Sequence, residues 1–285
     1  MEKDPSPIIK PADLIALKRT TKLVLVDVRT GPNAYENYAK THLEGALFVD
    51  LETQLATKSA NAADGGRHPL PSVGKFVEVL TKLGISNDSQ VVTYDNKNGS
   101  NAAARFWWML KAVGHAKIQV IDGGLQAAIA AGFSVSANEE KPLKSTPYEA
   151  EKWVLPLVTL EDVKKATHDD KMLIIDVRDK ARFGGLTEPI DLIAGHIPNA
   201  VNVPFGDNLD ANGFYEDPSV LKAKYAEILE NRASDEVIVH CGSGVTACHT
   251  LLAMAHAGME IPPLYVGSWG EWSRNDLPMI TATEV

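Results

Sequence analysis

The chain contains an internal repeat, and this repeat constrains its fold more than any other feature of the sequence. A run of branched apolar residues ending in Asp-x-Arg occurs at Leu23–Arg29 and again at Met172–Arg178. In each half a His-x-x-x-Ala segment follows, from His42 and from His196, and leads into another apolar strand. One arrangement of strands is therefore expected to occur twice along the chain.

Strands alternate with helical patterns in both halves. A third strand runs into a polar turn from Val91 and from Val237, and apolar residues at helical spacing follow over 103–114 and 247–258. Each helical pattern closes on a glycine, a common residue at the end of a helix. The alternation predicts α/β domains with mainly parallel sheets flanked by helices. We place the two domains at 1–140 and 157–285, with a linker at 141–156.

The two halves differ at one equivalent strand-to-helix turn, where the first carries Asp95 and the second carries Cys241. Cys241 lies directly between a strand and a helix, in the loop C-G-S-G-V-T. Its two glycines permit a tight turn whose backbone N–H groups converge, and the helix adds the positive end of its dipole. Such a loop stabilises a thiolate and then a persulfide, so Cys241 is the predicted nucleophile and the first domain is predicted to be non-catalytic.

Two other cysteine chemistries fit this loop less well. Cysteine phosphatases clamp phosphate with the arginine of a C-x-x-x-x-x-R loop, and Ala247 holds that position here. A thioredoxin-type disulfide needs C-x-x-C spacing, whereas Cys248 lies further along the predicted helix. We expect Cys248 to serve packing.

Composition limits the partners and the compartment. The net charge of −9 argues against nucleic acid and anionic membranes as partners. The N-terminal residues lack the basic-then-apolar pattern of a secretory signal, and no apolar run reaches the length of a transmembrane helix. With 2 cysteines and no export signal, the chain is expected in the reducing cytoplasm.

Short motifs spread over nearly the whole chain carry a family resemblance. They are C-G-S-G-V-T-A from Cys241, the paired D-V-R segments, G-H-I-P-N-A from Gly195, D-G-G-L from Asp122 and G-S-W-G-E-W from Gly267. Together they resemble the tandem rhodanese-domain sulfurtransferases. The resemblance implies two rhodanese-like α/β domains, of which the C-terminal one is catalytic. It also implies a two-step reaction through a persulfide, with no metal or organic cofactor.

Loop composition separates subclasses within that family. Thiosulfate sulfurtransferases tend to carry basic residues after the cysteine, whereas C-G-S-G-V-T resembles the 3-mercaptopyruvate sulfurtransferases. A neutral loop also lacks the attraction that a doubly charged donor would exploit. We expect sulfur transfer from 3-mercaptopyruvate to cyanide or to a thiol, with a thioredoxin-like protein as a candidate acceptor. The alternatives are thiosulfate as the donor, and a persulfide-relay or binding module that serves a partner protein.

The resemblance also implies which residues bind the donor. Arg182 matches the family arginine that reaches the donor, and its planar guanidinium suits a carboxylate or a sulfonate; the alternative is a surface salt bridge. A second substrate arginine of this subclass is missing from Thr187–Ala194, so one arginine suffices, another basic residue replaces it, or the donor differs. The remaining predicted donor-binding residues are Gly242, Gly244, Val245, Thr246 and Trp269.

A proton relay beside the cysteine is the last feature that the resemblance implies. Ser243 fits its serine, His68 in G-R-H-P-L-P fits its histidine, and Glu52 stands where an aspartate is usual. A neutral histidine there could take the proton of the donor thiol or orient the serine hydroxyl. The alternative is that His68 and Glu52 belong to an ordinary exposed loop.

The repeated Asp-x-Arg pairs, and the repeated histidines His42 and His196, are expected to serve the scaffold because they also occur in the copy without a nucleophile. His240, His249 and His256 lie near Cys241 in the sequence, but no carboxylate or spare thiol completes a metal site. We predict no metal.

Overall fold

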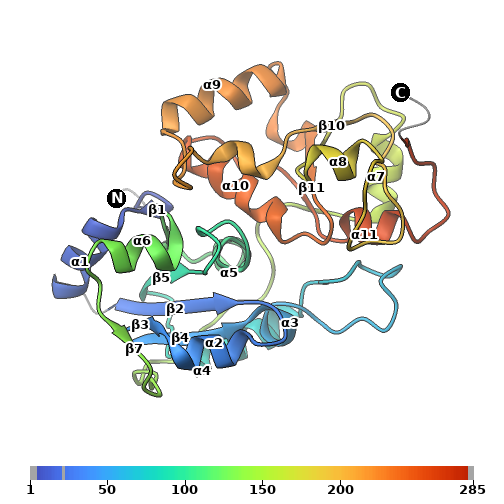
Figure 1. Ribbon diagram of the computed structural model, residues 1–285. Coiled ribbons are helices and arrows are strands. Elements are labelled where there is room, and N and C mark those ends of the chain that lie inside the picture. Colours follow the sequence, from blue (N-terminus) through green and yellow to red (C-terminus); the bar gives the residue numbers. More distant parts are fainter. Residues whose placement is uncertain (1–4, 21–22, 282–285) are drawn as a thin grey trace. The chain divides into compact units, whose positions relative to one another are not determined.

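The computed structural model describes residues 5–20 and 23–281. The chain forms two compact units (Figure 1). The first comprises the chain up to Ala56 together with Pro71–Val154 and Gly213–Tyr215, and the second comprises Thr57–Leu70, Leu155–Asn212 and the chain from Glu216 onward. The segment 57–70, placed in the first domain by the sequence analysis, thus groups with the second unit. Residues 1–4, part of the segment inspected for a secretory signal, lie outside the described residues.

A parallel five-stranded sheet of order β1-β6-β5-β2-β4 forms the centre of the first unit. Its strands are β1 (Ile8–Ile9), β2 (Leu23–Arg29), β4 (Ala46–Asp50), β5 (Gln90–Tyr94) and β6 (Ile118–Ile121). Its helices are α1 (Pro11–Thr20), α2 (Ala34–Lys40), α3 (Leu51–Gln54), α4 (Val73–Lys82), α5 (Ala102–Ala112) and α6 (Gly124–Ala130). Strands β3 (His42–Leu43) and β7 (Val135–Ser136) pair as a separate antiparallel ribbon.

Helices cover both faces of this sheet. Figure 1 shows α1 and α6 above β2, and α2 and α4 beneath it. All residues of β6 are buried, as expected for a strand that packs helices on both sides. One face contributes Leu25, Val92 and Ile121 to a core that also contains Leu14 of α1 and Leu125 of α6.

The second unit repeats this architecture with a parallel sheet of order β10-β9-β11-β12-β8. Its strands are β8 (Leu157–Val158), β9 (Leu173–Asp176), β10 (Ala200–Asn202), β11 (Val237–His240) and β12 (Leu264–Tyr265). Its helices are α7 (Leu160–Ala166), α8 (Lys180–Phe183), η1 (Phe205–Asn208), α9 (Pro218–Leu229), η2 (Ser234–Glu236), α10 (Thr246–His256) and α11 (Ser268–Trp272). The strands follow one another across both sheets in the same order of appearance, which confirms the α/β repeat.

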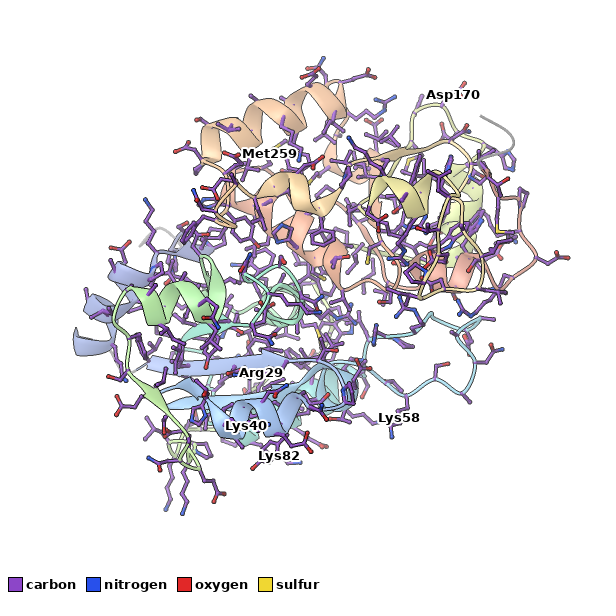
Figure 2. The ribbon with its side chains drawn as sticks, in the orientation of Figure 1. Arg29, Lys40, Lys58, Lys82, Asp170 and Met259 are labelled. Atoms are coloured by element: carbon purple, nitrogen blue, oxygen red, sulfur yellow. The ribbon has the colours of Figure 1, made fainter. Side chains whose placement is uncertain are left out.

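The repeated Asp-x-Arg pairs form equivalent buried ion pairs. Arg29 Nε lies 2.7 Å from Asp27 Oδ1, and Arg178 Nη2 lies 2.6 Å from Asp176 Oδ2. Each arginine also donates to a backbone carbonyl across the sheet edge, that of Thr41 and that of Gly195. Figure 2 labels Arg29, the last residue of β2. These pairs hold the loops that follow the strands, which is the scaffold role expected of them.

The repeated histidines behave alike in the two units. His42 stacks on Tyr38, with Nδ1 at 2.9 Å from the Tyr38 carbonyl. His196 stacks on Phe183, with Nδ1 at 2.8 Å from the Phe183 carbonyl. Each ring therefore ties its own segment back to the preceding helix, α2 or α8, in keeping with the scaffold role expected of both histidines.

Two local expectations need correction. Strand β9 begins at Leu173 and ends at Asp176, so it is shorter than the strand-like run Met172–Arg178. Trp269 and Trp272 lie in helix α11, a helix that the sequence patterns did not predict. This helix forms because Ser268 bonds the Tyr265 carbonyl and the N–H groups of Trp269 and Gly270 donate to the Cys241 loop.

Residues 141–156, predicted as a linker, contain neither helix nor strand. Tyr148 within them is 2% exposed, and its N–H donates to Thr81 Oγ1 of the first unit at 3.1 Å. The segment up to Val154 therefore packs on the first unit; the predicted domain limits stay a prediction. Among the helices of the described residues, none has the length and apolar character that crossing a membrane requires.

His249 makes the stability of the second unit depend on pH. It is fully buried on α10, packed edge-on against Phe205, and burial lowers its pKa from 6.5 to about 3. In the unfolded chain the imidazole takes up a proton below pH 6.5, whereas in the folded chain it stays neutral down to about pH 3. Its contribution to stability is thus present above pH 6.5 and is lost as the pH falls.

We predict that acidification from about pH 7.5 to about pH 5 removes about 2 kcal/mol of unfolding free energy through this group alone. In His249→Gln that loss should be absent, as measured by urea unfolding at the two pH values. His168→Gln, a change at an exposed histidine, is the matched control, and its unfolding free energy should depend on pH as that of the parent does. An unchanged pH dependence in His249→Gln would contradict the assignment.

Candidate active site

Cys241 lies at the carboxyl end of β11, the central strand of the second sheet. Its loop is fixed to α11 through the backbone: the N–H of Trp269 donates to the Cys241 carbonyl at 3.0 Å, and the N–H of Gly270 donates to the Gly242 carbonyl at 2.9 Å. The Cys241 N–H in turn donates to Ser268 Oγ at 3.2 Å. Cys241 itself is 1% exposed, so the thiol is held in a rigid, enclosed position.

The glycines of this region are required by close backbone contacts. Gly244 has φ +71°, and a methyl group on it would lie 2.7 Å from the Val266 carbonyl oxygen. A methyl group on Gly270 would lie 2.7 Å from the Gly242 carbonyl oxygen. Cys248 is buried on α10, and its Sγ donates to the Gly244 carbonyl, in keeping with the packing role expected of it. The loop can therefore approach α11 only with glycine at these positions.

The equivalent loop of the first unit shows what such a turn does for a negative charge. The Asp95 carboxylate accepts hydrogen bonds from four backbone N–H groups, those of Lys97, Gly99, Asn101 and Ala103, at 2.8 to 3.1 Å. The Leu125 N–H donates to the Asp95 carbonyl at 3.0 Å, just as that of Trp269 donates to Cys241. The carboxylate thus occupies an anion-binding turn of its own loop.

Burial nevertheless raises the pKa of Asp95, because the loss of water outweighs the four backbone hydrogen bonds, which lower it. An acidic side chain therefore holds the position that a cysteine holds in the second unit, and the first unit has no thiol at this turn.

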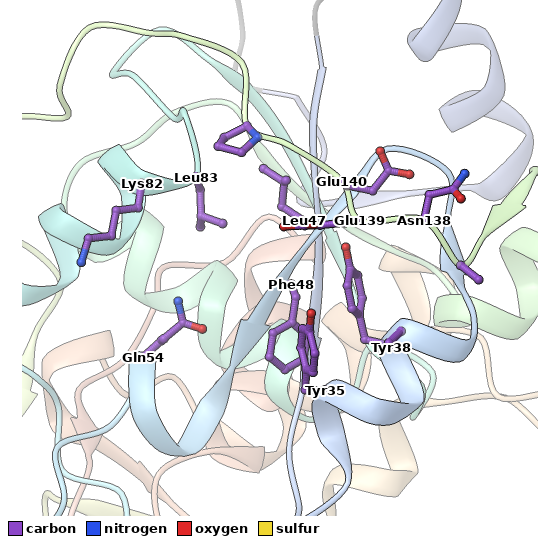
Figure 3. Close-up of a pocket in the computed structure, with 13 residues that line it drawn as sticks. Tyr35, Tyr38, Leu47, Phe48, Gln54, Lys82, Leu83, Asn138, Glu139 and Glu140 are labelled. Carbon is purple, nitrogen blue, oxygen red and sulfur yellow. The ribbon is translucent and has the colours of Figure 1, made fainter.

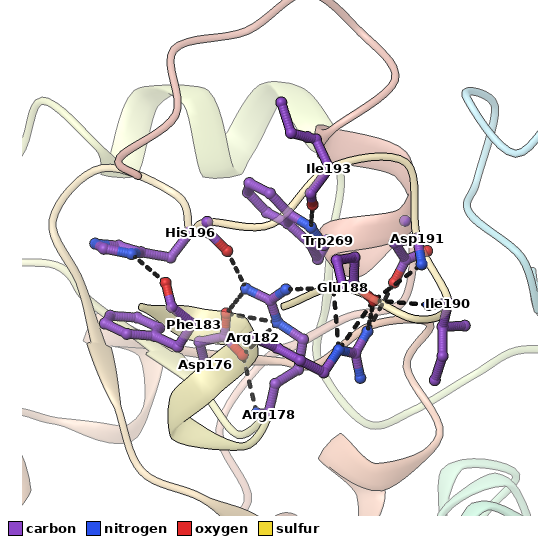
Figure 4. Close-up of polar contacts among 12 residues, drawn as sticks. Asp176, Arg178, Arg182, Phe183, Glu188, Ile190, Asp191, Ile193, His196 and Trp269 are labelled. Carbon is purple, nitrogen blue, oxygen red and sulfur yellow. Dashed lines mark hydrogen bonds and ion pairs between the residues drawn. The ribbon is translucent and has the colours of Figure 1, made fainter. Parts of the chain in front are cut away.

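Asp191 gathers three arginines beside the Cys241 loop. Its buried carboxylate lies 2.8 Å from Nε of Arg67, 3.0 Å from Nη2 of Arg182 and 3.3 Å from Nη1 of Arg274. The three arginines come from the segment 57–70, from α8 and from the residues after α11. Figure 4 shows Asp191 and Glu188 facing Arg182. Arg182 was predicted from the sequence, whereas Arg67, Asp191 and Arg274 were not.

Glu188 holds the guanidinium of Arg182 from the other side. Arg182 Nε lies 3.0 Å from each oxygen of Glu188, which also accepts from the backbone N–H groups of Ile190 and Asp191 (Figure 4). Burial by itself would lower the pKa of Arg182, but the hydrogen bond and charge of Glu188 and the charge of Asp191 raise it. Burial would likewise raise the pKa of Glu188, yet these hydrogen bonds lower it. Both groups therefore stay charged.

The space over Gly242 is bordered by charged groups. A methyl group on Gly242 would lie 3.0 Å from Nη2 of Arg67, 3.1 Å from Oδ2 of Asp191 and 3.2 Å from Nη2 of Arg182. Gly242 directly follows the cysteine. Two guanidinium tips thus converge over the residue that follows Cys241, although the loop itself carries no charge.

Two members of the predicted relay lie together. Nδ1 of His68 is 2.8 Å from Oγ of Ser243, and both residues belong to the second unit. Glu52 belongs to the first unit, where its Oε1 accepts a hydrogen bond from Thr30 Oγ1 at 2.8 Å. The structure therefore pairs the serine and the histidine, and the relay role of all three stays a prediction.

The other predicted donor-binding residues surround the same loop. Val245 and Thr246 begin α10, with Val245 buried and Thr246 half-buried. The indole of Trp269 is fully buried, donates to the Ile193 carbonyl at 2.8 Å and stacks over the guanidinium of Arg178 at 4.7 Å (Figure 4). Trp269 thus packs against Arg178, the arginine of the buried pair with Asp176.

A separate cavity of about 430 Å³ lies in the first unit, lined by Tyr35, Tyr38, Phe48 and Glu140 among others (Figure 3). Its lining contains no cysteine, serine or histidine. Among the described residues, no three His, Cys, Asp or Glu side chains come together as a metal site would require.

The sequence of the chain is similar to those of known proteins. The model of the rhodanese-like domain matches residues 10–131 and 159–275. A Pseudomonas aeruginosa protein named "Probable 3-mercaptopyruvate sulfurtransferase" is 37% identical over 91% of this chain and 89% of its own length. The mouse thiosulfate sulfurtransferase is 33% identical over 86% of this chain and 82% of its own.

A solved structure agrees with these relatives. SseA of Escherichia coli, described as a 3-mercaptopyruvate sulfotransferase, superimposes with a TM-score of 0.75 at 29% identity, covering 93% of this chain and 99% of that one. The chain therefore belongs to the rhodanese family, with two rhodanese-like domains. It is an enzyme, a sulfurtransferase. The family and fold predictions are confirmed.

Weak signals for the missed residues were present in the sequence. Arg67 stands next to His68 in G-R-H-P-L-P, and Asp191 lies in the stretch where the second substrate arginine is missing. Neither position follows a strand of the repeat, so no rule of local sequence brings them to Cys241.

We predict that Gly242→Ala folds normally but loses about tenfold in kcat/KM for sulfur transfer. Its backbone needs no positive φ, whereas its methyl group would press on both guanidinium tips, at a cost of about 1–2 kcal/mol. Gly206→Ala, where a methyl group meets nothing within 4 Å, is the matched control. Equal kinetics for Gly242→Ala and the parent, at equal unfolding midpoints, would rule out a donor site over Gly242.

Proposed function

We propose that the protein moves sulfane sulfur from 3-mercaptopyruvate to a thiol or cyanide acceptor through a persulfide on Cys241. One observation supports this proposal. The Cys241 turn is the only described turn of this kind that bears a thiol, and in its counterpart in the first unit four backbone N–H groups donate to the carboxyl oxygens of Asp95. A persulfide is an anion of similar size. The same turn in the second unit is therefore suited to hold it.

The first half-reaction breaks the carbon–sulfur bond of the donor. The Cys241 thiolate attacks the donor sulfur, and the electron pair of the carbon–sulfur bond passes to the methylene carbon as the enolate of pyruvate. The proton of the transferred sulfur then moves to that carbon, which gives pyruvate and the Cys241 persulfide anion. In the second half-reaction the acceptor attacks the outer sulfur and releases the Cys241 thiolate.

The charge around Gly242 supports a donor with a single carboxylate. The guanidinium groups of Arg67, Arg182 and Arg274 face the carboxylates of Glu188 and Asp191, so among these five groups the cations exceed the anions by one. One donor carboxylate would balance it. Thiosulfate, the second candidate, brings two negative charges to the same place, and the family relatives carry the names of both activities.

We assign the proton transfer to Ser243 and His68. Their 2.8 Å contact pairs a hydroxyl with an imidazole two residues after Cys241, a pair that can carry a proton from the transferred sulfur to the enolate carbon. Glu52 is proposed as the carboxylate that orients His68. The loop residues Gly242, Gly244, Val245 and Thr246 and the indole of Trp269 are proposed to shape the donor site.

The acceptor and the compartment follow from the same proposal. A persulfide anion is open to attack by small thiols, cyanide or the thiol of a thioredoxin-like protein, and a chain with 2 free cysteines suits the cytoplasm.

Loading of Cys241 is the direct test. Incubation with 3-mercaptopyruvate should add one sulfur atom to the intact mass of the parent and of Cys248→Ser, and none to Cys241→Ser. Cys248→Ser is the matched control because its thiol is also buried. No gain of mass with either 3-mercaptopyruvate or thiosulfate would overturn the proposal, and gain with thiosulfate alone would assign the second candidate.

The relay predicts a difference between the donors. Thiosulfate releases sulfite and requires no proton at carbon, whereas 3-mercaptopyruvate requires one. Ser243→Ala should therefore slow single-turnover loading from 3-mercaptopyruvate by about a hundredfold and loading from thiosulfate by far less. Equal slowing with both donors in quenched-flow mass measurements would show that Ser243 only supports the loop.

A further inference from the structure

The second guanidinium of the donor site comes from a different part of the chain than the sequence suggests. Thr187–Ala194 contains no arginine, yet Nη2 of Arg67 reaches the space over Gly242 as closely as Nη2 of Arg182 does. We propose that Arg67 binds the donor carboxylate together with Arg182, and that Asp191 holds the place of that carboxylate when no donor is bound. This inference rests on the proposed function and deepens it.

The position of Arg67 is set by strong contacts. Its Nε lies 2.8 Å from Asp191 Oδ1 and its Nη2 lies 3.5 Å from Oδ2. Nη2 of Arg182 lies 3.0 Å from the same Oδ2. One carboxylate oxygen thus already lies between the two guanidinium tips, which shows that the pair accepts an anion in this geometry.

In this proposal the carboxylate of Asp191 and the carboxylate of 3-mercaptopyruvate compete for the same two guanidinium groups. The Asp191 side chain is fully buried, whereas the side chains of Arg67 and Arg182 are 25% and 12% exposed. The arginine side of this ion cluster is therefore the side that solvent reaches. A carboxylate arriving from solvent meets the exposed guanidinium edges first and adds to, or replaces, the bonds of Asp191 Oδ2.

Arg67 also joins donor binding to proton transfer. It directly precedes His68, whose Nδ1 contacts Ser243, the residue that follows Gly242. Gly65 is fixed in the same segment, since its N–H donates to Glu271 Oε1 of α11 at 2.8 Å. One anchored segment thus supplies both the guanidinium and the imidazole, so a carboxylate bound at Arg67 lies beside the groups that handle the proton.

The first test measures binding without turnover. In the Cys241→Ser background, Arg67→Gln should weaken the Kd of 3-mercaptopyruvate, measured by titration calorimetry, by about tenfold or more. Arg67→Lys, which keeps the charge but not the fork, should recover part of the affinity. Arg232→Gln changes the net charge equally at a surface pair with Glu230 and should leave the Kd unchanged.

The second test separates carboxylate binding from support of the loop. The second substrate is 1-mercaptopropan-2-one, which has a methyl group in place of the carboxylate. With Cys241 intact, Arg67→Gln should raise the KM for 3-mercaptopyruvate, and so lower its kcat/KM, by about tenfold or more. The kcat/KM for 1-mercaptopropan-2-one should change less than about threefold. Equal losses on both donors would mean that Arg67 only holds Asp191 and His68 in place, and would overturn the inference.

The outcomes distinguish this inference from the proposed function. If the parent protein takes no sulfur from 3-mercaptopyruvate, the proposed function fails. If the parent is loaded and Arg67→Gln binds and reacts like the parent, the role of Arg67 alone fails.

Discussion

The carboxylate of Asp191 is the contact on which the arrangement beside Cys241 depends. It bonds arginines from three separate segments and is fully buried, so its charge would be costly without them. The ion cluster positions Arg67 and Arg182 over Gly242, while Glu188 keeps Arg182 charged and oriented. A positively charged, preorganised surface thereby lies next to a loop that carries no charge of its own.

The repeated fold explains how one turn serves two purposes. In both units a turn after the central strand is closed by a backbone bond from the following strand-to-helix connection, Leu125 to Asp95 and Trp269 to Cys241. In the first unit the N–H groups of that turn donate to the carboxyl oxygens of its own side chain, Asp95. In the second the side chain is a thiol, and the anion is the thiolate or the persulfide that the proposed reaction forms on it.

Patterns of local sequence predicted the fold well, and the candidate site only in part. Alternating strands and helices, the Asp-x-Arg pairs and the cysteine turn are all encoded within short segments, and each occurs where expected. Helix α11 was missed because its first turn depends on bonds to the distant Cys241 loop. The His68–Ser243 contact was anticipated only through resemblance to a family, since nothing local joins those two positions.

The sequence by itself determined the doubled α/β architecture, the strand-to-helix turn that bears Cys241 and the absence of a thiol from the same turn of the first copy, because each of these is a property of neighbouring residues. The tertiary structure alone decided which charges surround the Cys241 loop. A neutral C-G-S-G-V-T loop pointed to a site without strong positive charge, yet Arg67, Arg182 and Arg274 converge there. Folding brings them together because a single buried carboxylate can be stabilised only by cations that the chain supplies from elsewhere.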